Sequence, residues 1–384
     1  MNNPGLASII INNCNYAGFL PEAIDSALNQ TYRHIEVIVV DDGSTDRSRE
    51  VIASYGHRIT PVLKENGGQT SALNAAFRVS RGQIIHFLDA DDMLLPTAVE
   101  RTTEVCLDPH SAKAHWPLLE IDTHSQETGK VWCSNLPEGD LREAVLNDGP
   151  DSIHHPPTTG NAFTRRFLEN VLPLPEVENS FKLHHASADM ILSALAPLYG
   201  RIGRILEPQG YYRLHGSNGY SSLRFEDRLR RDLLTYNHLC SIVAQHCGRM
   251  GLSFDEESWK KNSWVIRLCR ASQVIAALVP PGDALILVDE DHWKAGPSLM
   301  GRKCFPFLEH DGGYWGKPSD DSTAIHEIGR LRRAGASFIA FAWPAFWWLD
   351  YYSGMRQYLR AGFRCIHEDD CLVVFDLRDN GASL

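Results

Sequence analysis

The sequence predicts an α/β fold with a mostly parallel central sheet, followed by a helical segment and a second small α/β domain. Two observations in the first hundred residues support this prediction. Short apolar runs alternate with stretches in which apolar residues recur at helical spacing, as in a parallel sheet covered by helices. Polar residues follow each run, at the sheet edge where such folds bind ligands.

The elements of this first part follow in a regular order. Residues 19–28, the segment around Val51 and Ile52, and residues 69–79 have helical spacing, and Gly82 ends the last of these helices. Between the helices we expect four strands, at residues 7–11, 35–40, 59–63 and 84–89. Residues 97–222 are less regular, apart from an apolar helix that opens at Ser187-Ala188-Asp189.

Residues 224–278 have a helical pattern, and Pro280-Pro281-Gly282 then marks a boundary. Beyond it, strands are predicted at residues 284–288, 337–342 and 371–377, with helices at 324–334 and 351–359. Aromatic residues in 312–318 and 343–350 suit either a sugar-stacking surface or core packing. The expected division is 1–222, a helical connector at 223–280, and a small α/β domain of unclear role at 281–384.

The composition narrows the class of protein. The 384 residues have a net charge of −11, which argues against a general binder of nucleic acid or of anionic membranes. The nine cysteines include no Cys-x-x-Cys pair, so reduced thiols in a cytoplasmic protein are expected. The apolar stretch 338–349 is too short to span a bilayer. Peripheral attachment at the inner membrane face and a homodimer remain open.

A cluster of acids follows the fourth predicted strand. In Phe87-Leu88-Asp89-Ala90-Asp91-Asp92, three carboxylates stand together directly after an apolar run. Like charges so close are unfavourable unless a cation or a donor-rich ligand is present, and the pattern suits a divalent metal that bridges a diphosphate. An acidic loop that caps the next helix is the alternative. Asn13, Asp41-Asp42 and Asn66 follow the other three strands and should converge on the same crevice.

Five motifs in this order resemble the family 2 glycosyltransferases, which are inverting enzymes of the GT-A fold. The motifs are Asn15-Tyr16-x-x-Phe19-Leu20, Asp41-Asp42-Gly43-Ser44-Thr45-Asp46, Asn66-Gly67-Gly68, Asp89-Ala90-Asp91-Asp92 and Tyr212-Arg213-x-His215-x-x-Asn218. The resemblance covers about residues 7–222. It implies transfer of a sugar from a nucleotide donor to a hydroxyl acceptor.

The resemblance also implies residue roles. Asp91 would bind Mn²⁺ or Mg²⁺, with His215 as a further ligand or a contact to the diphosphate, and Asp89 would contact the ribose or support the metal. Asp189 would be the general base, although an acid at a helix N-terminus is also a common stabilising feature. The nucleotide would be bound by Asn13, Asn15, Asp41, Asp42, Asn66, Gly67 and Asp89. As an alternative to a role of His215, Arg213 would pair with Asp189 or with a phosphate.

The sequence departs from the family pattern at two positions that concern the nucleotide. Cys14 replaces a common tyrosine and Leu73 a common arginine. A UDP-sugar is favoured as the donor on family frequency alone. The acceptor is a glycan, a lipid-linked molecule or a small hydroxyl compound, and surface-glycan or polysaccharide synthesis is the expected setting. The alternatives are a non-catalytic protein that binds sugar nucleotides and, with less support, a nucleotidyltransferase.

Overall fold

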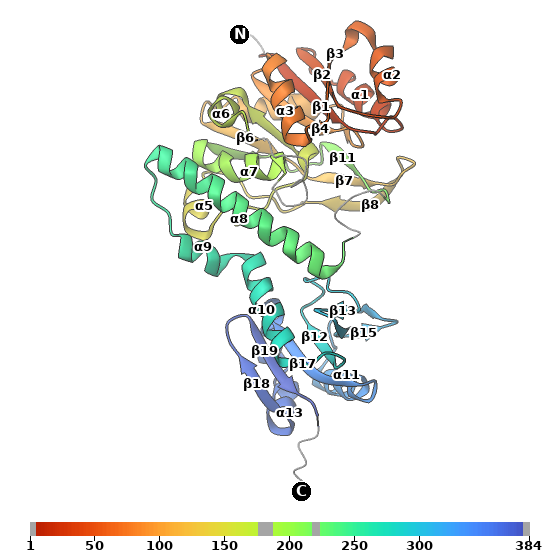
Figure 1. The fold of residues 1–384 in the computed structure, drawn as a ribbon, viewed down its shortest axis with the longest axis vertical. Helices are drawn as coiled ribbons and strands as arrows, with labels where there is room; N and C mark the ends of the chain where they lie inside the picture. Colours follow the sequence, from red (N-terminus) through yellow and green to blue (C-terminus); the bar gives the residue numbers. More distant parts are fainter. Residues whose placement is uncertain (1–4, 176–186, 217–222, 379–384) are drawn as a thin grey trace. The chain divides into compact units, whose positions relative to one another are not determined.

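The computed structural model describes residues 5–175, 187–216 and 223–378. These residues form two compact units (Figure 1). Unit 1 comprises Met1–Asn218 and Leu234–Ser263, and unit 2 comprises Gly219–Leu233 and Trp264–Leu384. Helix α8 (Phe225–Met250) therefore contributes to both units. The division into segments at residues 222 and 280 stays a prediction.

Unit 1 is built on a seven-stranded, mostly parallel sheet, as predicted. Its strand order is β10-β6-β9-β4-β1-β2-β3, and β9 is antiparallel to both of its neighbours. The strands are β1 (Ala7–Asn13), β2 (Ile35–Asp42), β3 (Thr60–Lys64), β4 (Ile84–Asp89), β6 (Ser111–His115), β9 (Asn161–Thr164) and β10 (Arg201–Arg204). Four of them form where the sequence predicted strands, whereas β6, β9 and β10 lie in the segment that showed no regular pattern.

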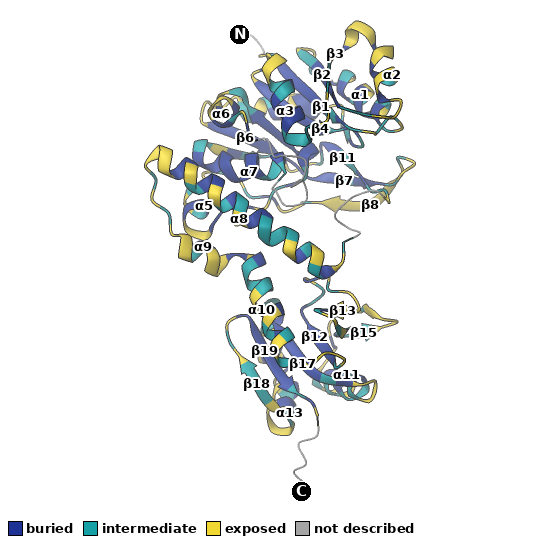
Figure 2. Cartoon of the chain, viewed as in Figure 1, coloured by how far each residue is buried: buried dark blue, intermediate teal, exposed yellow. Residues whose placement is uncertain are grey.

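Helices cover both faces of this sheet because successive side chains of a strand point to opposite faces. Ile10 and Phe87 pack in one core with α3, α6 and α7, whereas Ile9 and Val39 pack in another with α1 and α4. The central strands β1 and β4 are correspondingly buried (Figure 2), whereas the edge strand β3 is largely exposed. The helices of unit 1 are α1 (Leu20–Leu28), α2 (Ser48–Ser54), α3 (Gln69–Val79), α4 (Ala98–Cys106), α5 (Arg142–Asp148), α6 (Arg165–Val171), α7 (Ala188–Tyr199) and α9 (Glu256–Asn262), with short 3₁₀ turns η1 (Gly56–Arg58) and η2 (Thr158–Gly160).

A second sheet in unit 1 positions the acid motif. Its order is β5-β11-β7-β8, and the strands are β5 (Met93–Leu94), β7 (Leu118–Ile121), β8 (Glu127–Trp132) and β11 (Gly210–Arg213). Strand β5 begins directly after Asp92, and Met93 pairs with Tyr211. This pairing brings the end of β11 beside the acids that follow β4.

Unit 2 has a six-stranded sheet of order β13-β14-β12-β17-β19-β18. Strands β12 (Ala284–Val288) and β17 (Ala336–Ala342) form as predicted, whereas β13 (Ser298–Leu299), β14 (Arg302–Pro306) and β18 (Arg364–Glu368) were not predicted. The other elements are α10 (Trp264–Leu278), β15 (Glu309–His310), β16 (Gly313–Tyr314), α11 (Asp321–Arg333), η4 (Trp343–Ala345), α12 (Trp347–Tyr351), α13 (Ser353–Gly362) and β19 (Leu372–Asp376).

The aromatic residues of unit 2 divide between core and surface. Trp348 is fully buried, while Trp347, Tyr351 and Trp315 expose 38%, 70% and 71% of their surface. Both indole N–H groups of Trp347 and Trp348 donate to Glu290 Oε1, at 2.6 and 2.8 Å. Among the described residues, no helix combines the length and apolar character that crossing a bilayer requires.

Candidate active site

The three acids after β4 have different environments. Asp92 is almost fully buried, and its carboxylate accepts hydrogen bonds from the Thr159 hydroxyl at 2.6 Å and the Arg213 backbone N–H at 2.9 Å. Burial raises its pKa, and the negative charges of Asp91 and Asp89 raise it further. Asp92 therefore holds β11 and η2 against the end of β4 and is not free for a ligand.

Asp91 is paired with His215. The His215 Nε2 atom lies 2.9 Å from Asp91 Oδ2, and the imidazole stacks on Phe19 at a centroid distance of 5.4 Å. The Arg213 guanidinium is fully buried, and it donates to the Asp91 carbonyl at 2.7 Å and to the Glu22 carboxylate at 2.8 Å. Arg213 therefore fixes the backbone of the motif, and its pairing with Asp189 or a phosphate stays a prediction.

Asp89 and Asp189 come together from opposite parts of the chain. Asp89 ends β4, and Asp189 lies in the first turn of α7. Burial raises the pKa of Asp89 to about 8, and the charges of Asp91 and Asp189 contribute further to this increase. The Asp189 Oδ1 atom is buried without a hydrogen-bond partner among the described residues. Mutually repelling carboxylates in a buried setting call for a cation or a donor-rich ligand.

At the edge of the sheet beside β2, Asp41 is held by three groups. Asn13 Nδ2 donates to its Oδ1 at 3.1 Å, and Arg49 Nε and the Ser44 N–H donate to its Oδ2 at 2.8 and 3.2 Å. Burial opposes ionisation of Asp41, but these hydrogen bonds outweigh it and hold the pKa below its ordinary value. Asn13 Oδ1 is itself buried and has no hydrogen-bond partner among the described residues, so this amide is a polar group available to a ligand.

Asp42 organises the loop after β3. Its carboxylate accepts from Lys64 Nζ at 2.7 Å and from the N–H groups of Gly67 and Gly68 at 2.8 and 2.7 Å. The Asn66 side chain donates to the Asp42 carbonyl at 2.8 Å. Asp42, one of the predicted site residues, therefore fixes the conformation of this loop. The assignment of Asp41 or Asp42 to the base stays a prediction.

Asn15 connects the loops after β1 and β2. Its backbone has a left-handed φ of 62°, and its side-chain oxygen accepts from the Thr45 N–H at 2.7 Å. Cys14, which stands where a tyrosine is common in the family pattern, belongs to the same group of loop residues, because Asn66 Nδ2 lies 3.3 Å from Cys14 Sγ. The structure thus gathers Asn13, Asn15, Asp41, Asp42, Asn66 and Gly67 at the carboxyl ends of β1, β2 and β3. Asn218 lies outside the described residues.

Tyr16 and Tyr212 complete the surroundings of the acids, and the sequence assigned no definite site role to either. Burial raises the pKa of Tyr16 to about 12, with further contributions from Asp91 and Asp89. Burial and the charges of Asp92 and Asp89 also raise the pKa of Tyr212. Both phenols therefore lie within electrostatic reach of the motif. In the sequence, the only signal that Tyr16 and Tyr212 lie at the site was their position next to Asn15 and Arg213 in the two motifs.

The donor set at the acid motif fits a hard divalent cation. Asp91 and His215 offer an oxygen and a nitrogen, and small cations such as Mg²⁺ usually bind one or two protein groups together with phosphate oxygens and water. Among the described residues, three ligand atoms come within 4.8 Å of one another only at Asp369, Asp370 and Cys371. In that cluster, the Asp369 carboxylate already accepts hydrogen bonds from the N–H groups of Cys371 and Leu372. At the acid motif, a bound diphosphate would therefore complete the coordination of a cation held by Asp91 and His215.

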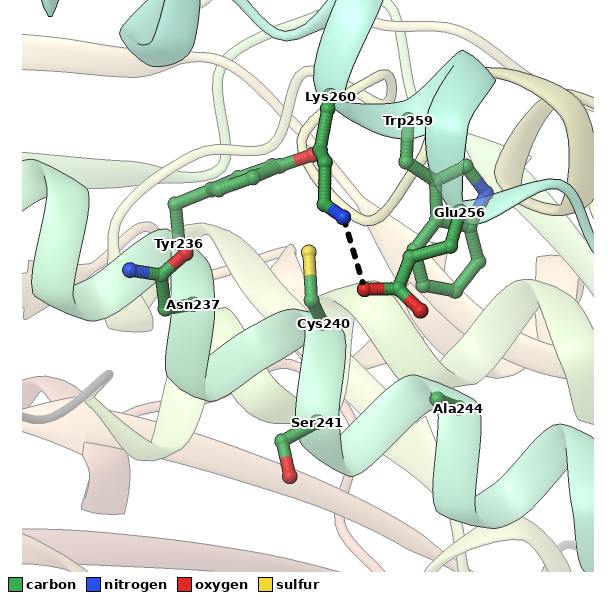
Figure 3. Close-up of a pocket in the computed structure, with 8 residues that line it drawn as sticks. All are labelled: Tyr236, Asn237, Cys240, Ser241, Ala244, Glu256, Trp259 and Lys260. Atoms are coloured by element: carbon green, nitrogen blue, oxygen red, sulfur yellow. Dashed lines mark ion pairs between the residues drawn. The ribbon is translucent and has the colours of Figure 1, made fainter.

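A separate cavity of about 310 Å³ lies where α8 packs against α9 (Figure 3). Two of its lining residues, Lys260 and Glu256, form an ion pair at 3.3 Å (Figure 3). None of the predicted site residues lines it; the lining is Tyr236, Asn237, Cys240, Ser241, Ala244, Glu256, Trp259 and Lys260. This cavity is therefore not part of the candidate active site.

Comparisons with known proteins point to one family. The family model described as Glycosyl transferase family 2 matches residues 8–171. An uncharacterised glycosyltransferase of Nostoc sp. (strain PCC 7120) is 35% identical over 221 residues, which cover 56% of this chain and 66% of the relative. A second, from Rickettsia typhi, is 45% identical over 100 residues, 26% of this chain and 31% of the relative.

The chain therefore spans two thirds or less of the length of these relatives. Among solved structures, S. aureus TarS in complex with UDP-GlcNAc is 18% identical with a TM-score of 0.46, and the match covers 71% of this chain and 83% of that one. A TM-score at this level marks a partial likeness.

Proposed function

Residues 8–171 belong to glycosyl transferase family 2, and from this premise we propose that the protein is a metal-dependent, inverting glycosyltransferase. It would move a sugar from a nucleotide donor to a hydroxyl acceptor. The observation that carries the proposal is the convergence of Asp89, Asp91 and Asp189 at the carboxyl edge of the central sheet. Burial is the largest cause of the raised pKa of Asp89, and repulsion by Asp91 and Asp189 raises this pKa further.

Asp91 and His215 would hold Mn²⁺ or Mg²⁺, with Asp89 in support. When bound, the cation would stabilise the negative charge that develops on the leaving diphosphate. Thr158 and Gln69 form hydrogen bonds with Asp89 that favour its ionised form. These hydrogen bonds oppose only part of the increase in the pKa of Asp89 that burial and the charges of Asp91 and Asp189 cause, so a bound cation would be needed to favour its anionic form at neutral pH.

Asp189 would act as the general base. Inversion requires one base that takes the proton from the acceptor hydroxyl on the side of the sugar opposite the leaving group. The Asp189 carboxylate has a buried oxygen without a hydrogen-bond partner among the described residues, so a lone pair is available for an acceptor hydroxyl. Asp189 lies in the first turn of α7, where its side chain is fixed by the start of that helix.

The nucleotide would lie over β1, β2 and β3, where Asn13 Oδ1 is buried and unpaired among the described residues. A UDP-sugar is the favoured donor, and Asp41 or Asp42 would read its base. The acceptor would be a glycan, a lipid-linked molecule or a small hydroxyl compound in surface-glycan or polysaccharide synthesis. We place this reaction in the cytoplasm.

A thermal-shift panel tests this proposal. The full chain would be heated with UDP, GDP, dTDP or CMP, each with Mn²⁺ and with EDTA. One nucleotide should raise the melting temperature by about 2–4 °C in a metal-dependent manner. Asp91→Ala should remove that rise, whereas the matched variant Glu104→Ala should retain it, because Glu104 exposes 60% of its side chain on α4.

Turnover separates the alternatives. The nucleotide that binds would be supplied as its sugar conjugate, and release of nucleoside diphosphate would be followed. Binding without turnover would favour a non-catalytic protein that binds sugar nucleotides, and release of pyrophosphate from a nucleoside triphosphate would favour a nucleotidyltransferase. A response that is independent of metal and unchanged in Asp91→Ala would overturn the proposal.

A further inference from the structure

Strand β8, at the edge of the second sheet of unit 1, ends in an exposed tryptophan. All six residues of β8 are exposed (Figure 2), and Trp132 leaves 38% of its surface accessible. Its indole Nε1 donates to Glu120 Oε2 at 2.8 Å, and Glu120 is itself almost fully buried. The indole ring is therefore accessible and also held in one orientation, as a preformed binding surface requires.

The strand register puts Trp132 on the same face of this sheet as Tyr212. Trp132 pairs with Leu118 across the antiparallel β7–β8 ladder, and Tyr212 pairs with Glu120 across the parallel β7–β11 ladder. Because Leu118 and Glu120 are two residues apart on β7, both side chains point to one face. Their cross-strand partners share that face, and the two rings meet with centroids 5.2 Å apart and planes at 60°. Trp132 and Tyr212 thus form an aromatic wall.

The aromatic wall begins beside the candidate active site. Arg213, which follows Tyr212, donates its backbone N–H to Asp92 at 2.9 Å. Burial raises the pKa of Tyr212, and the negative charges of Asp92 and Asp189 are among those that raise it further. Since β8 is the outer strand of the order β5-β11-β7-β8, the aromatic wall runs from the surroundings of these acids to the edge of the sheet. A molecule that reaches Asp189 along this face would contact both rings.

The groups around the aromatic wall favour a neutral sugar as the molecule that binds there. The C–H groups on one face of a pyranose pack on the electron-rich face of an aromatic ring, and its hydroxyl groups donate hydrogen bonds to carboxylates. Lys130, the cation of β8, is paired with Glu120 at 3.7 Å. With Asp89 and Asp189 near the inner end, an anionic molecule would meet carboxylates of like charge.

We propose that the aromatic wall binds the acceptor, and that the acceptor presents a neutral sugar ring whose C–H face stacks on Trp132 while one hydroxyl meets Asp189. The inference rests on the proposed function, in which Asp189 is the base, and it narrows the acceptor to a carbohydrate. Trp132 determines specificity in this arrangement and takes no part in proton transfer. Its removal should weaken binding of the sugar and leave nucleotide binding unchanged.

Saturation-transfer difference NMR tests sugar binding without turnover. The full chain, with and without Mn²⁺ and UDP, would be mixed with the methyl glycosides of glucose, galactose, mannose and N-acetylglucosamine. Methyl glucuronide provides an anionic ring, and glycerol a polyol without a ring. At least one neutral glycoside should receive saturation on the C–H protons of one ring face, and glycerol and the glucuronide should receive little.

Variants at Trp132 locate the binding. Trp132→Leu retains apolar bulk but removes the ring, so the dissociation constant of the glycoside should rise about fivefold. Trp132→Phe retains a ring and should bind more tightly than Trp132→Leu. Val131→Ala is the matched control, because Val131 is 47% exposed on β8 and points to the opposite face. Trp315→Ala removes an exposed tryptophan of unit 2. Both controls should bind as the wild type does.

Two results would overturn the inference. One is a wild type that transfers saturation to none of the neutral glycosides. The other is a Trp132→Leu variant that binds the glycoside as the wild type does, including the case in which Trp315→Ala loses binding instead. Thermal melting of each variant, with Mn²⁺ and UDP, would show that the fold and the nucleotide response are retained.

Kinetics separate a contact with the acceptor from a structural role. With a donor that is turned over, the bound glycoside should accelerate release of the nucleoside diphosphate. Trp132→Leu should raise the KM for the glycoside about fivefold, with kcat and the KM for the donor changed less than about twofold. A loss confined to kcat would overturn the inference. Failure of the proposed function would look different, since the wild type would then release no nucleoside diphosphate while glycoside binding still depended on Trp132.

Discussion

Asp89, Asp91 and Asp92 stand within four residues, yet each carboxylate has a different environment. Asp92 is satisfied by Thr159 and the backbone of Arg213, Asp91 meets an imidazole, and Asp89 faces Asp189. The difference follows from the direction in which each side chain leaves the end of β4. Chemistry at this motif is therefore a property of single residues and should be altered by single substitutions.

Replacement of the candidate base provides the first prediction. Asp189→Asn should lower kcat by about 10² to 10⁴-fold, because an amide cannot take the proton from the hydroxyl group of the acceptor. Metal-dependent binding of the nucleotide should persist, as Asp91 and His215 are unchanged. Turnover of a sugar nucleotide and the thermal shift with UDP would be measured on the same preparation. A variant that retains more than a tenth of wild-type kcat would exclude Asp189 as the base.

At the scale of elements, three segments are tied together at the amino ends of β1, β2 and β4. Glu36 of β2 accepts from the Ser8 hydroxyl at 2.7 Å and from the Arg81 backbone N–H at 2.5 Å. The Gly82 N–H donates to Ser8 Oγ at 2.9 Å. Because the opposite ends of these strands carry the candidate site, this network sets the register of the sheet on which the site depends.

The second prediction concerns Glu36 and pH. Burial opposes its ionisation, but hydrogen bonds from Ser8 and Arg81 outweigh burial and lower the pKa below its ordinary value of 4.5. A carboxyl with a lowered folded-state pKa stabilises the fold above pH 4.5, and this contribution is lost as the pH falls through the folded-state value. Glu36→Gln should therefore cost about 1 kcal/mol in urea unfolding at pH 7. A difference that did not narrow toward pH 3 would contradict this account.

The third prediction concerns the close approach at Gly82. A Cβ atom at this position would lie 2.4 Å from the Ser8 backbone nitrogen and 2.5 Å from its hydroxyl. Gly82→Ala should therefore cost about 1–3 kcal/mol of unfolding free energy. Gly248→Ala is the matched control, because it lies within α8 with no atom within 4 Å of the added Cβ and should be neutral or stabilising. Urea unfolding of both variants checks the contrast.

At the scale of the whole molecule, each compact unit has its own core. Ile286, Phe341 and Trp348 belong to the core of unit 2, whereas the candidate site and the two cores around the seven-stranded sheet belong to unit 1. Because the described members of each of these cores belong to one unit, we expect the folding of unit 2 and nucleotide binding by unit 1 to respond to different substitutions.

The fourth prediction follows from this separation. Trp348 is fully buried, so Trp348→Ala should destabilise unit 2 by about 3–5 kcal/mol. Denaturation should then show an early transition of unit 2, while the metal-dependent response to the nucleotide is retained. Circular dichroism and the thermal-shift panel would measure the two effects. Loss of the nucleotide response in this variant would show that the units are energetically coupled.

The sequence by itself determined the elements that are apolar throughout and the polar and acidic residues at their ends. Strands β1, β2 and β4 are predictable because continuous apolar residues have one stable destination, a sheet covered on both faces. The acids that follow them are neighbours in the sequence as well as in space. Strands such as β6, whose five residues include Lys113 and His115, escaped prediction because their burial is imposed by neighbouring elements.

Tertiary structure alone decided which distant residues meet. Asp189 lies a hundred residues beyond Asp89, and only the packing of α7 against the sheet brings the two carboxylates together with Lys113. Likewise, the pairing of β11 with β5 brings Arg213 to the acid motif. There the Arg213 backbone N–H donates to Asp92, and its buried guanidinium donates to the Asp91 carbonyl. Periodicity in a sequence reports which residues are buried within one element, whereas the distance between two elements depends on how all of the intervening chain packs.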